Sequence, residues 1–219
     1  MPKPMYVWSG SAWVSVAAEV ESLANYATVN YASTQPGMKM VVPTSVAVGS
    51  GSGSVDTNGA VTFSGASSVS LNGCFSSTYD NYVLILTIDA VSSDNVLYLK
   101  LRASGTDSSV TYYYGLQGLN SIGTLYSASA ANVSDGIWIM ENDTGATAKP
   151  TIARIELYTP ALAQRTNSRI TNSTNATGGV YAGWAGFGSH TTSTAYDGAS
   201  LISSAGTITG TIRVYGMKN

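Results

Sequence analysis

Charged residues are scarce in this chain of 219 residues. Lys, Arg, Asp and Glu make up 10% of it, and the formal net charge is −2. A soluble domain usually carries roughly a quarter charged residues, so Ser, Thr, Asn, Gly and Tyr must build most of this surface. The 10 basic residues are scattered singly from Lys3 to Lys218. A basic patch of the kind that binds nucleic acid is therefore excluded.

Cysteine and histidine each occur once, as Cys74 and His190. A single cysteine excludes an intrachain disulfide and a cysteine-rich metal site. Cys74 lies in "LNGCFSS" without a basic neighbour, so we expect a small buried apolar residue and not a reactive thiol. The chain also lacks GxGxxG and GxxxxGK segments. We expect no metal and no cofactor.

Long apolar runs are missing as well. No stretch of about 18 apolar residues is present, which excludes a membrane-spanning helix. The opening "MPKPMYVWSGSAW" lacks the apolar segment of a signal peptide. The chain is therefore expected to fold in a reducing cytoplasm.

His190 offers the one position for histidine-dependent catalysis. It lies in "GFGSHTTST", which is typical of a loop, and Ser189 and Asp197 are the residues that a Ser-His-Asp triad would recruit. Such a triad is identified by geometry, which a sequence does not supply. We favour a solvated loop histidine and expect no enzymatic activity.

Acidic residues gather at the ends of two predicted strands. Asp89 with Asp94, and Asp135 with Glu141 and Asp143, are the two groups. Paired carboxylates hydrolyse glycosides or bind Ca²⁺. Asp is also an ordinary turn residue, and neither group has the spacing of a calcium loop. The interpretation as turns is favoured.

The first 33 residues predict a hairpin followed by a short helix. "YVWSGSAWVSV", residues 6–16, alternates around a Gly and places Trp8 opposite Trp13. Residues 16–33 contain no Gly or Pro. Their apolar residues have coiled-coil spacing, at Val16, Val20, Leu23 and Ala27. A threefold seam and an amphipathic helix packed on its own domain both fit this spacing.

A Gly/Ser-rich stretch, "VGSGSGSVDTNG", divides the chain at residues 48–59 and is typical of a flexible linker. "MKMVVP" before it is a candidate strand. We expect an attachment and oligomerisation segment over 1–47, a linker over 48–59 and one compact domain over 60–219.

From residue 60 onward apolar and polar residues alternate with the period of a β-strand. Ala153, Ile155 and Leu157, for example, share one face of "TIARIELYT". No helix interrupts these segments, so we predict an all-β fold, an antiparallel two-sheet sandwich of jelly-roll type. The candidate strands are AVTFSG, SVSLNG, YVLILTIDAV, VLYLKLRAS, VTYYYGL, GIWIMEN, TIARIELYT, NSRITNST, GVYAGWAGF, TAYDGASLIS and TITGTIRVYG.

Tyrosine dominates the aromatic residues, with 14 Tyr against 4 Trp and 3 Phe. A Tyr ring offers a flat apolar face and a hydroxyl, which suits both subunit interfaces and stacking on sugars. A purely structural role inside the sandwich is the alternative. The candidate glycan contacts are Tyr112, Tyr113, Tyr114, Tyr181 and Trp184.

Four segments resemble the C-terminal β-domains of tailed-bacteriophage structural proteins, namely minor tail proteins, tail fibres and head fibres. The N-terminal "YVWSGSAWVSV" is similar to the short entry modules of such fibres. The four segments are LNGCFSSTYDNYVLIL, LYLKLRASGTD, IARIELYTPALAQRT and TAYDGASLISSAGTITGTIRVYGMKN.

The resemblance implies a non-enzymatic virion component, usually a homotrimer, that is assembled in the host cytoplasm. Its N-terminal part would dock on other virion proteins, with Tyr6, Trp8 and Trp13 as attachment candidates, and its sandwich would face outward. Host adhesion through a surface glycan is the expected role. A head fibre or capsid decoration protein with a mainly structural role is the alternative, and a glycan-cleaving tailspike is a third.

Overall fold

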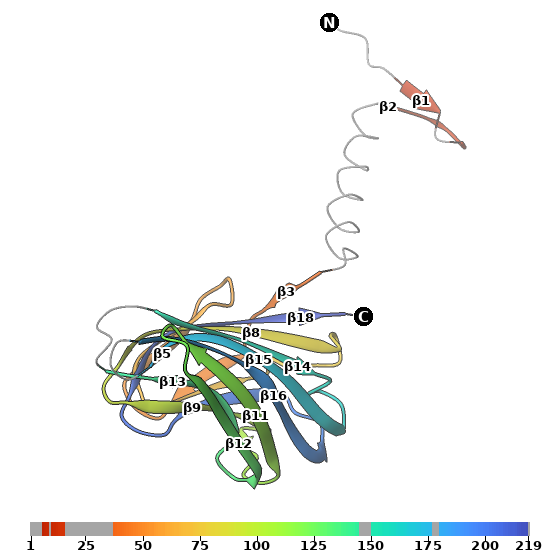
Figure 1. Ribbon diagram of the computed structural model, residues 1–219. Coiled ribbons are helices and arrows are strands. Elements are labelled where there is room, and N and C mark those ends of the chain that lie inside the picture. Colours follow the sequence, from red (N-terminus) through yellow and green to blue (C-terminus); the bar gives the residue numbers. More distant parts are fainter. Residues whose placement is uncertain (1–5, 9, 16–36, 145–149, 177–179, 219) are drawn as a thin grey trace, which may run out of the picture. The chain divides into compact units, whose positions relative to one another are not determined.

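The sequence from residue 38 onward forms two antiparallel β-sheets that pack face to face (Figure 1). This computed structural model describes residues 6–8, 10–15, 37–144, 150–176 and 180–218. The chain divides into two units, Met1–Gly37 and Met38–Asn219. The second unit confirms the predicted all-β antiparallel two-sheet sandwich, and the described residues contain no helix.

The larger sheet has ten strands, and β12 and β5 lie at its two edges. A tenth strand, β3 (Lys39–Val41), pairs with β18 beside β6. The order is β12 (Leu125–Val133), β11 (Tyr112–Asn120), β16 (Val180–Thr194), β15 (Gln164–Ala176), β14 (Thr151–Tyr158), β8 (Asn81–Val91), β18 (Ile208–Met217), β6 (Val61–Ala66) and β5 (Ser52–Val55).

The smaller sheet has six strands, and β13 (Ile137–Asn142) pairs with β9 outside the main order. That order is β10 (Thr106–Asp107), β9 (Asn95–Ala103), β17 (Gly198–Ser203), β7 (Ser68–Asn72) and β4 (Ser45–Val48).

The core lies between the sheets and follows the predicted alternation. Ala153, Ile155 and Leu157 of β14 are fully buried, as are Leu97 and Leu99 of β9. Side chains of successive residues leave opposite faces of a strand, so every second residue reaches the core. Burial of this apolar surface is the main stabilisation of the sandwich.

Strand β18 near the C-terminus is an interior strand. It pairs with β8 along its whole length and with β6 and β3 on its other side. Ile208, Ile212 and Val214 are buried, as the alternation of TITGTIRVYG predicts, and the register with β8 shifts between Thr209 and Gly210. A Cβ at Gly210 would lie 2.1 Å from the carbonyl oxygen of Thr87, so the close approach of β8 requires glycine there.

The burial of Arg102 departs from the alternation that the sequence predicts for β9. Its alternation in β9 assigns it to the solvated face with Lys100, yet it is 9% exposed. Its Nη1 donates to Asp107 Oδ1 at 2.6 Å and to the hydroxyls of Ser70 and Ser200. A buried guanidinium is tolerated because these partners replace its water.

The boundary of the sandwich is also corrected. Residues 52–55, expected in a flexible linker, form β5 and pair with β6, while β3 and β4 pair with β18 and β7. Backbone pairing overrides a Gly/Ser composition because each paired residue satisfies its N–H and C=O groups. The compact unit therefore begins at Met38 and not at residue 60.

The N-terminal unit contains the predicted hairpin. β1 (Tyr6–Trp8) pairs with β2 (Trp13–Ser15), and Trp8 lies opposite Trp13, with ring centroids 5.6 Å apart. Gly10 in the turn has a φ of 95°. The two Trp side chains are 57% and 68% exposed.

The predicted helix over 16–33 and its candidate seam residues, Val16, Val20, Leu23 and Ala27, lie outside the described residues. Within the part of the chain that is described, no helix is long and apolar enough to cross a membrane.

Candidate functional site

A polar pocket of about 330 Å³ lies where two connections of the sandwich meet. One wall is residues 109–111, between β10 and β11, and the other is residues 132–135, between the end of β12 and β13. We call it the Asp135 pocket. Its lining comprises Ser109, Val110, Thr111, Asn132, Val133, Ser134 and Asp135.

Tyr112, directly after the first wall, fixes that wall in place through its hydroxyl group. Its ring is fully buried, and its hydroxyl donates to the carbonyl oxygen of Ser108 at 3.2 Å while accepting from the N–H of Leu101 at 2.9 Å. Burial raises the pKa of Tyr112 far above its usual value, so this phenol stays protonated. The connection before β11 is thereby tied to β9.

Thr111 is held by His190. Thr111 has a φ of 61°, and its hydroxyl lies 3.2 Å from His190 Nδ1 and 2.9 Å from the hydroxyl of Thr192. His190 Nδ1 also lies 3.3 Å from the Thr111 carbonyl oxygen, which can only accept, so Nδ1 donates. In the neutral ring Nε2 then accepts from the Tyr196 hydroxyl, 2.6 Å away.

His190 is thus buried in strand β16, and the expectation of a solvated loop histidine was wrong. Its ring stacks on Tyr112 with centroids 4.3 Å apart, and burial lowers its pKa. The triad partners are engaged elsewhere, since the Ser189 hydroxyl donates to Asn167 and Asp197 Oδ2 accepts from the N–H of Ser104. His190 therefore supports the wall of the pocket, and the described structure does not assemble the Ser189–His190–Asp197 triad.

The second wall depends on a sharp change of direction after β12. Asn132 has a φ of 55°, a conformation that Asn tolerates better than most residues. Gly136 has a φ of 116°, and a Cβ there would lie 2.6 Å from the carbonyl oxygen of Leu99. Asp135 stands between them at the surface and accepts a long hydrogen bond, 3.5 Å, from Ser134. Its carboxylate therefore faces solvent at the mouth of the pocket.

Tyr98 and Tyr114 lie close enough to Asp135 to respond to its charge. Burial raises the pKa of both phenols, and the negative charge of Asp135 raises each further. A hydrogen bond between the two hydroxyls links them. Tyr114 is half-buried, and Tyr113, which follows Thr111 by two residues, is also half-buried. Tyr114 therefore lies near the pocket, whereas Tyr113 leaves β11 on the opposite face.

The other predicted glycan contacts are not brought together with them. Tyr112 is fully buried and Trp184 is 7% exposed, so neither presents a face to a ligand. Trp184 packs instead on Trp138, with centroids 4.9 Å apart. Tyr181 is 46% exposed, but it lies on β16 eight residues from Ser189, the partner of Tyr113. That separation corresponds to roughly 26 Å along the strand.

Phe187 is an exposed aromatic residue that the sequence did not single out. It is 60% exposed and pairs with Gly115, over which its ring lies. The alternation in β16 puts Phe187 and Tyr181 on the face opposite Trp184. The sequence therefore indicates that these two rings share a face. The pattern alone does not say which of those faces is the core.

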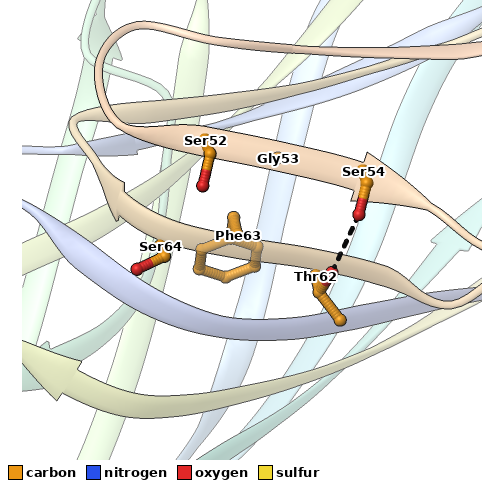
Figure 2. A pocket seen from close by; sticks show the side chains of 6 residues that line it. All are labelled: Ser52, Gly53, Ser54, Thr62, Phe63 and Ser64. Atoms are coloured by element: carbon orange, nitrogen blue, oxygen red, sulfur yellow. Dashed lines mark hydrogen bonds between the residues drawn. The ribbon is translucent and has the colours of Figure 1, made fainter.

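A second depression, of about 180 Å³, lies on the hairpin of β5 and β6 (Figure 2). Four hydroxyl side chains, those of Ser52, Ser54, Thr62 and Ser64, surround it, and Ser54 and Thr62 share a hydrogen bond of 3.1 Å. It contains no amide or carboxylate side chain among its lining residues. The Asp135 pocket is larger and chemically richer, so it is the better candidate site.

The remaining sequence candidates behave as structural residues. Cys74 is buried as expected, and burial raises its pKa to about 12, which keeps the thiol protonated. Asp94 accepts from the backbone and hydroxyl of Thr144, and these bonds lower its pKa. Among the described residues, no cluster of three or more His, Cys, Asp or Glu is placed to hold a metal ion.

Comparison of the chain with protein-family models, with curated proteins and with solved structures finds no match. The interpretation of the Asp135 pocket therefore rests on its own chemistry.

Proposed function

We propose that this chain is a structural component of a tailed-phage virion, a fibre-type protein that displays its β-sandwich for adhesion to a host-surface glycan. The observation that carries the proposal is the Asp135 pocket, which groups hydroxyl, amide and carboxylate side chains. Sites for small polar ligands combine a few such groups with aromatic side chains, and Tyr114, which lies near Asp135, is the aromatic residue here.

The pocket favours binding over cleavage. Asp135 is the one carboxylate among its lining residues, whereas glycoside hydrolysis usually needs an acid and a second carboxylate. We therefore propose no enzymatic role and no cofactor. Because the chain carries few charges, neutral hydrogen bonds would dominate the contact with the glycan.

We propose further that the sandwich is of jelly-roll type. What supports this is the strand order β7-β17-β9-β13 in the smaller sheet, in which the first and last strands of such a motif, β7 and β17, are neighbours. In the larger sheet, β8, β16, β11 and β12 follow one another once the hairpin of β14 and β15 is set aside. Jelly rolls alternate between their sheets in two Greek keys, and β14–β15 would be an insertion.

Attachment to the virion is assigned to the N-terminal unit, Met1–Gly37. In the hairpin of this unit, Trp8 and Trp13 are both exposed, and exposed aromatic residues are typical of docking surfaces. The resemblance of the sequence to phage fibre proteins supports the virion location and a homotrimer. The low charge and single cysteine agree with assembly in a reducing cytoplasm.

The test is binding of the full chain to an array of bacterial surface glycans. Asp135→Asn should weaken binding about tenfold or more, because hydrogen bonds to a charged group contribute about 1.5–3 kcal/mol. Asn132→Ala should weaken it as well. Asp89→Asn removes an exposed carboxylate of β8 outside the pocket and serves as the matched control. Equal binding by Asp135→Asn and the control would contradict the proposal.

A head fibre or capsid decoration protein with a mainly structural role is the second candidate. The observation that favours it is a group of exposed apolar side chains at the β11–β12 turn, Leu119, Ile122 and Leu125, which suit burial against another protein. Immunogold labelling of particles separates the two candidates. Label on the capsid, with no glycan bound by the folded chain, would establish the second.

A further inference from the structure

Strand β12 is the long unprotected edge of this sandwich. Sheet edges carry unpaired N–H and C=O groups, and proteins usually keep them short, charged or covered. In the described part of the chain, the edge strands β4 and β5 have four residues each and β10 has two. β13 has six residues and is almost entirely buried. β12 has nine residues and is mostly exposed, and β11 is its one partner in the larger sheet.

The sequence of β12 lacks the features that block edge pairing. Residues 125–130 read LYSASA, without a charge or a proline. Four of these residues, 127–130, are Ala or Ser with short side chains, so another backbone can approach closely. The one protective feature comes after them, where the register with β11 shifts and Asn132 adopts a φ of 55°. The regular edge therefore ends at residue 130.

Apolar side chains continue this edge at its start. Leu125 is 78% exposed and pairs with Leu119, which is 53% exposed, and Ile122 in the turn between them is 74% exposed. Large apolar side chains gathered at one end of an open strand are costly in water. A partner strand that covers the edge would also cover them.

We propose that a second copy of this chain occupies the edge, by antiparallel pairing of β12 with its own counterpart about a twofold axis. An uncharged strand meets no like-charge repulsion from itself, and the same bulge limits both copies to the same segment. A twofold axis normal to the sheet keeps the outer faces of both copies on one side, and it requires one residue of β12 to pair with its own copy across the axis. When Ala128 pairs with its own copy, Ser127 of each copy lies opposite Ser129 of the other.

This register can be tested with charged residues at positions 127 and 129, which lie opposite each other in the pair. Ser127 and Ser129 are both exposed, so Ser127→Lys with Ser129→Lys would place lysines directly opposite each other in the pair. Ser127→Lys with Ser129→Glu would instead place a lysine opposite a glutamate. Thr171→Lys with Ser173→Lys adds the same charge to exposed positions of the interior strand β15 and is the matched control.

The measurement is the mass of the full chain by light scattering after size exclusion, at one protein concentration, with circular dichroism showing that each variant folds. The double-lysine variant should fall to half of the wild-type mass or less, and the lysine-glutamate variant and the control should keep that mass. This reading holds whatever association the N-terminal segment adds. An unchanged mass of the double-lysine variant overturns the proposal. So does a wild-type chain that runs as a single copy, which would leave the edge to a different protein.

Discussion

Arg102 shows how one buried charge organises the smaller sheet. Its guanidinium binds Asp107, two serines and the carbonyl oxygen of Gly105, and its side chain is 11% exposed. Asp107 also accepts from the hydroxyl of Ser200 at 2.7 Å. These bonds join β9, β10, β7 and β17. Removal of one partner would leave a charge that is neither paired nor hydrated.

Asp107→Ala should lower the free energy of unfolding by about 3 kcal/mol, near the lower end for a broken buried ion pair because the Asp107 side chain is 28% exposed. Denaturant unfolding measures this change. Glu156→Ala breaks the more exposed pair of Arg154 and Glu156, whose side chains are 43% and 21% exposed, and should cost under about 1 kcal/mol. Equal losses in the two variants would show that the Arg102 network is not effectively buried.

His190 should make stability depend on pH. Burial lowers its pKa in the folded chain below the ordinary value of 6.5, so the unfolded chain binds the proton more readily. The stabilisation is therefore fully present above pH 6.5 and declines as the pH falls below it. The limiting slope for one proton is about 1.4 kcal/mol per pH unit. Protonation would also force the Tyr196 hydroxyl to stop donating to Nε2.

His190→Gln removes this titration, so its free energy of unfolding should stay level across the pH range in which the wild-type value declines. Urea unfolding at a series of pH values near and below 6.5 compares the two slopes. The pKa values of Asp94 and Glu156 are lowered, so these carboxylates titrate at more acidic pH. They therefore do not contribute to the difference in slope between the wild type and His190→Gln. Parallel slopes in the two proteins would show that another group is responsible.

At the scale of elements, strands with two different faces were predictable. β14 and β18 alternate between buried and more exposed residues, and Ala153, Ile155 and Leu157 of β14 lie on the buried face as predicted. β12 was not predicted, because this mostly exposed edge strand has small residues such as Ala128 on its half-buried face and so lacks a strong apolar alternation. β5 was hidden for a related reason, since "SGSV" has the composition of a linker. Both segments are strands because they pair with a neighbouring strand. The local sequence pattern does not reveal such pairing.

The candidate site was less predictable than the sheets. The walls of the Asp135 pocket come from segments about 20 residues apart in the chain, and their shape depends on positive φ angles at Thr111 and Asn132. Thr rarely adopts such an angle, and Asn tolerates it more often but does not by itself predict it. Alternation along β11 puts Tyr112 and Tyr114 on one face, but which of these rings is covered depends on the strands of the opposite sheet. His190 was misplaced because "GSHTTST" resembles a loop, whereas it continues β16.

At the scale of the whole molecule, the sandwich includes more of the chain than its composition suggests. β3 and β4 precede the Gly/Ser-rich stretch and pair with β18 and β7 in different sheets. Val46 and Val48 of β4 pack against the core. An N-terminal deletion that respects the fold must therefore end at residue 37, where the second unit begins, and not at residue 47.

Three fragments test this boundary. The fragment 38–219 should fold and unfold cooperatively. The fragment 48–219 lacks β3 and all of β4 except Val48, and the loss of the part-buried Val41 and Val46 with their strand pairing should cost about 3 kcal/mol, or roughly 6–12 °C in Tm. The fragment 38–205 lacks the interior strand β18 and should show no cooperative transition at all, because β8, β6 and β3 lose their shared partner. Thermal unfolding by calorimetry compares them, and equal Tm values for 38–219 and 48–219 would return the boundary to the Gly/Ser-rich stretch.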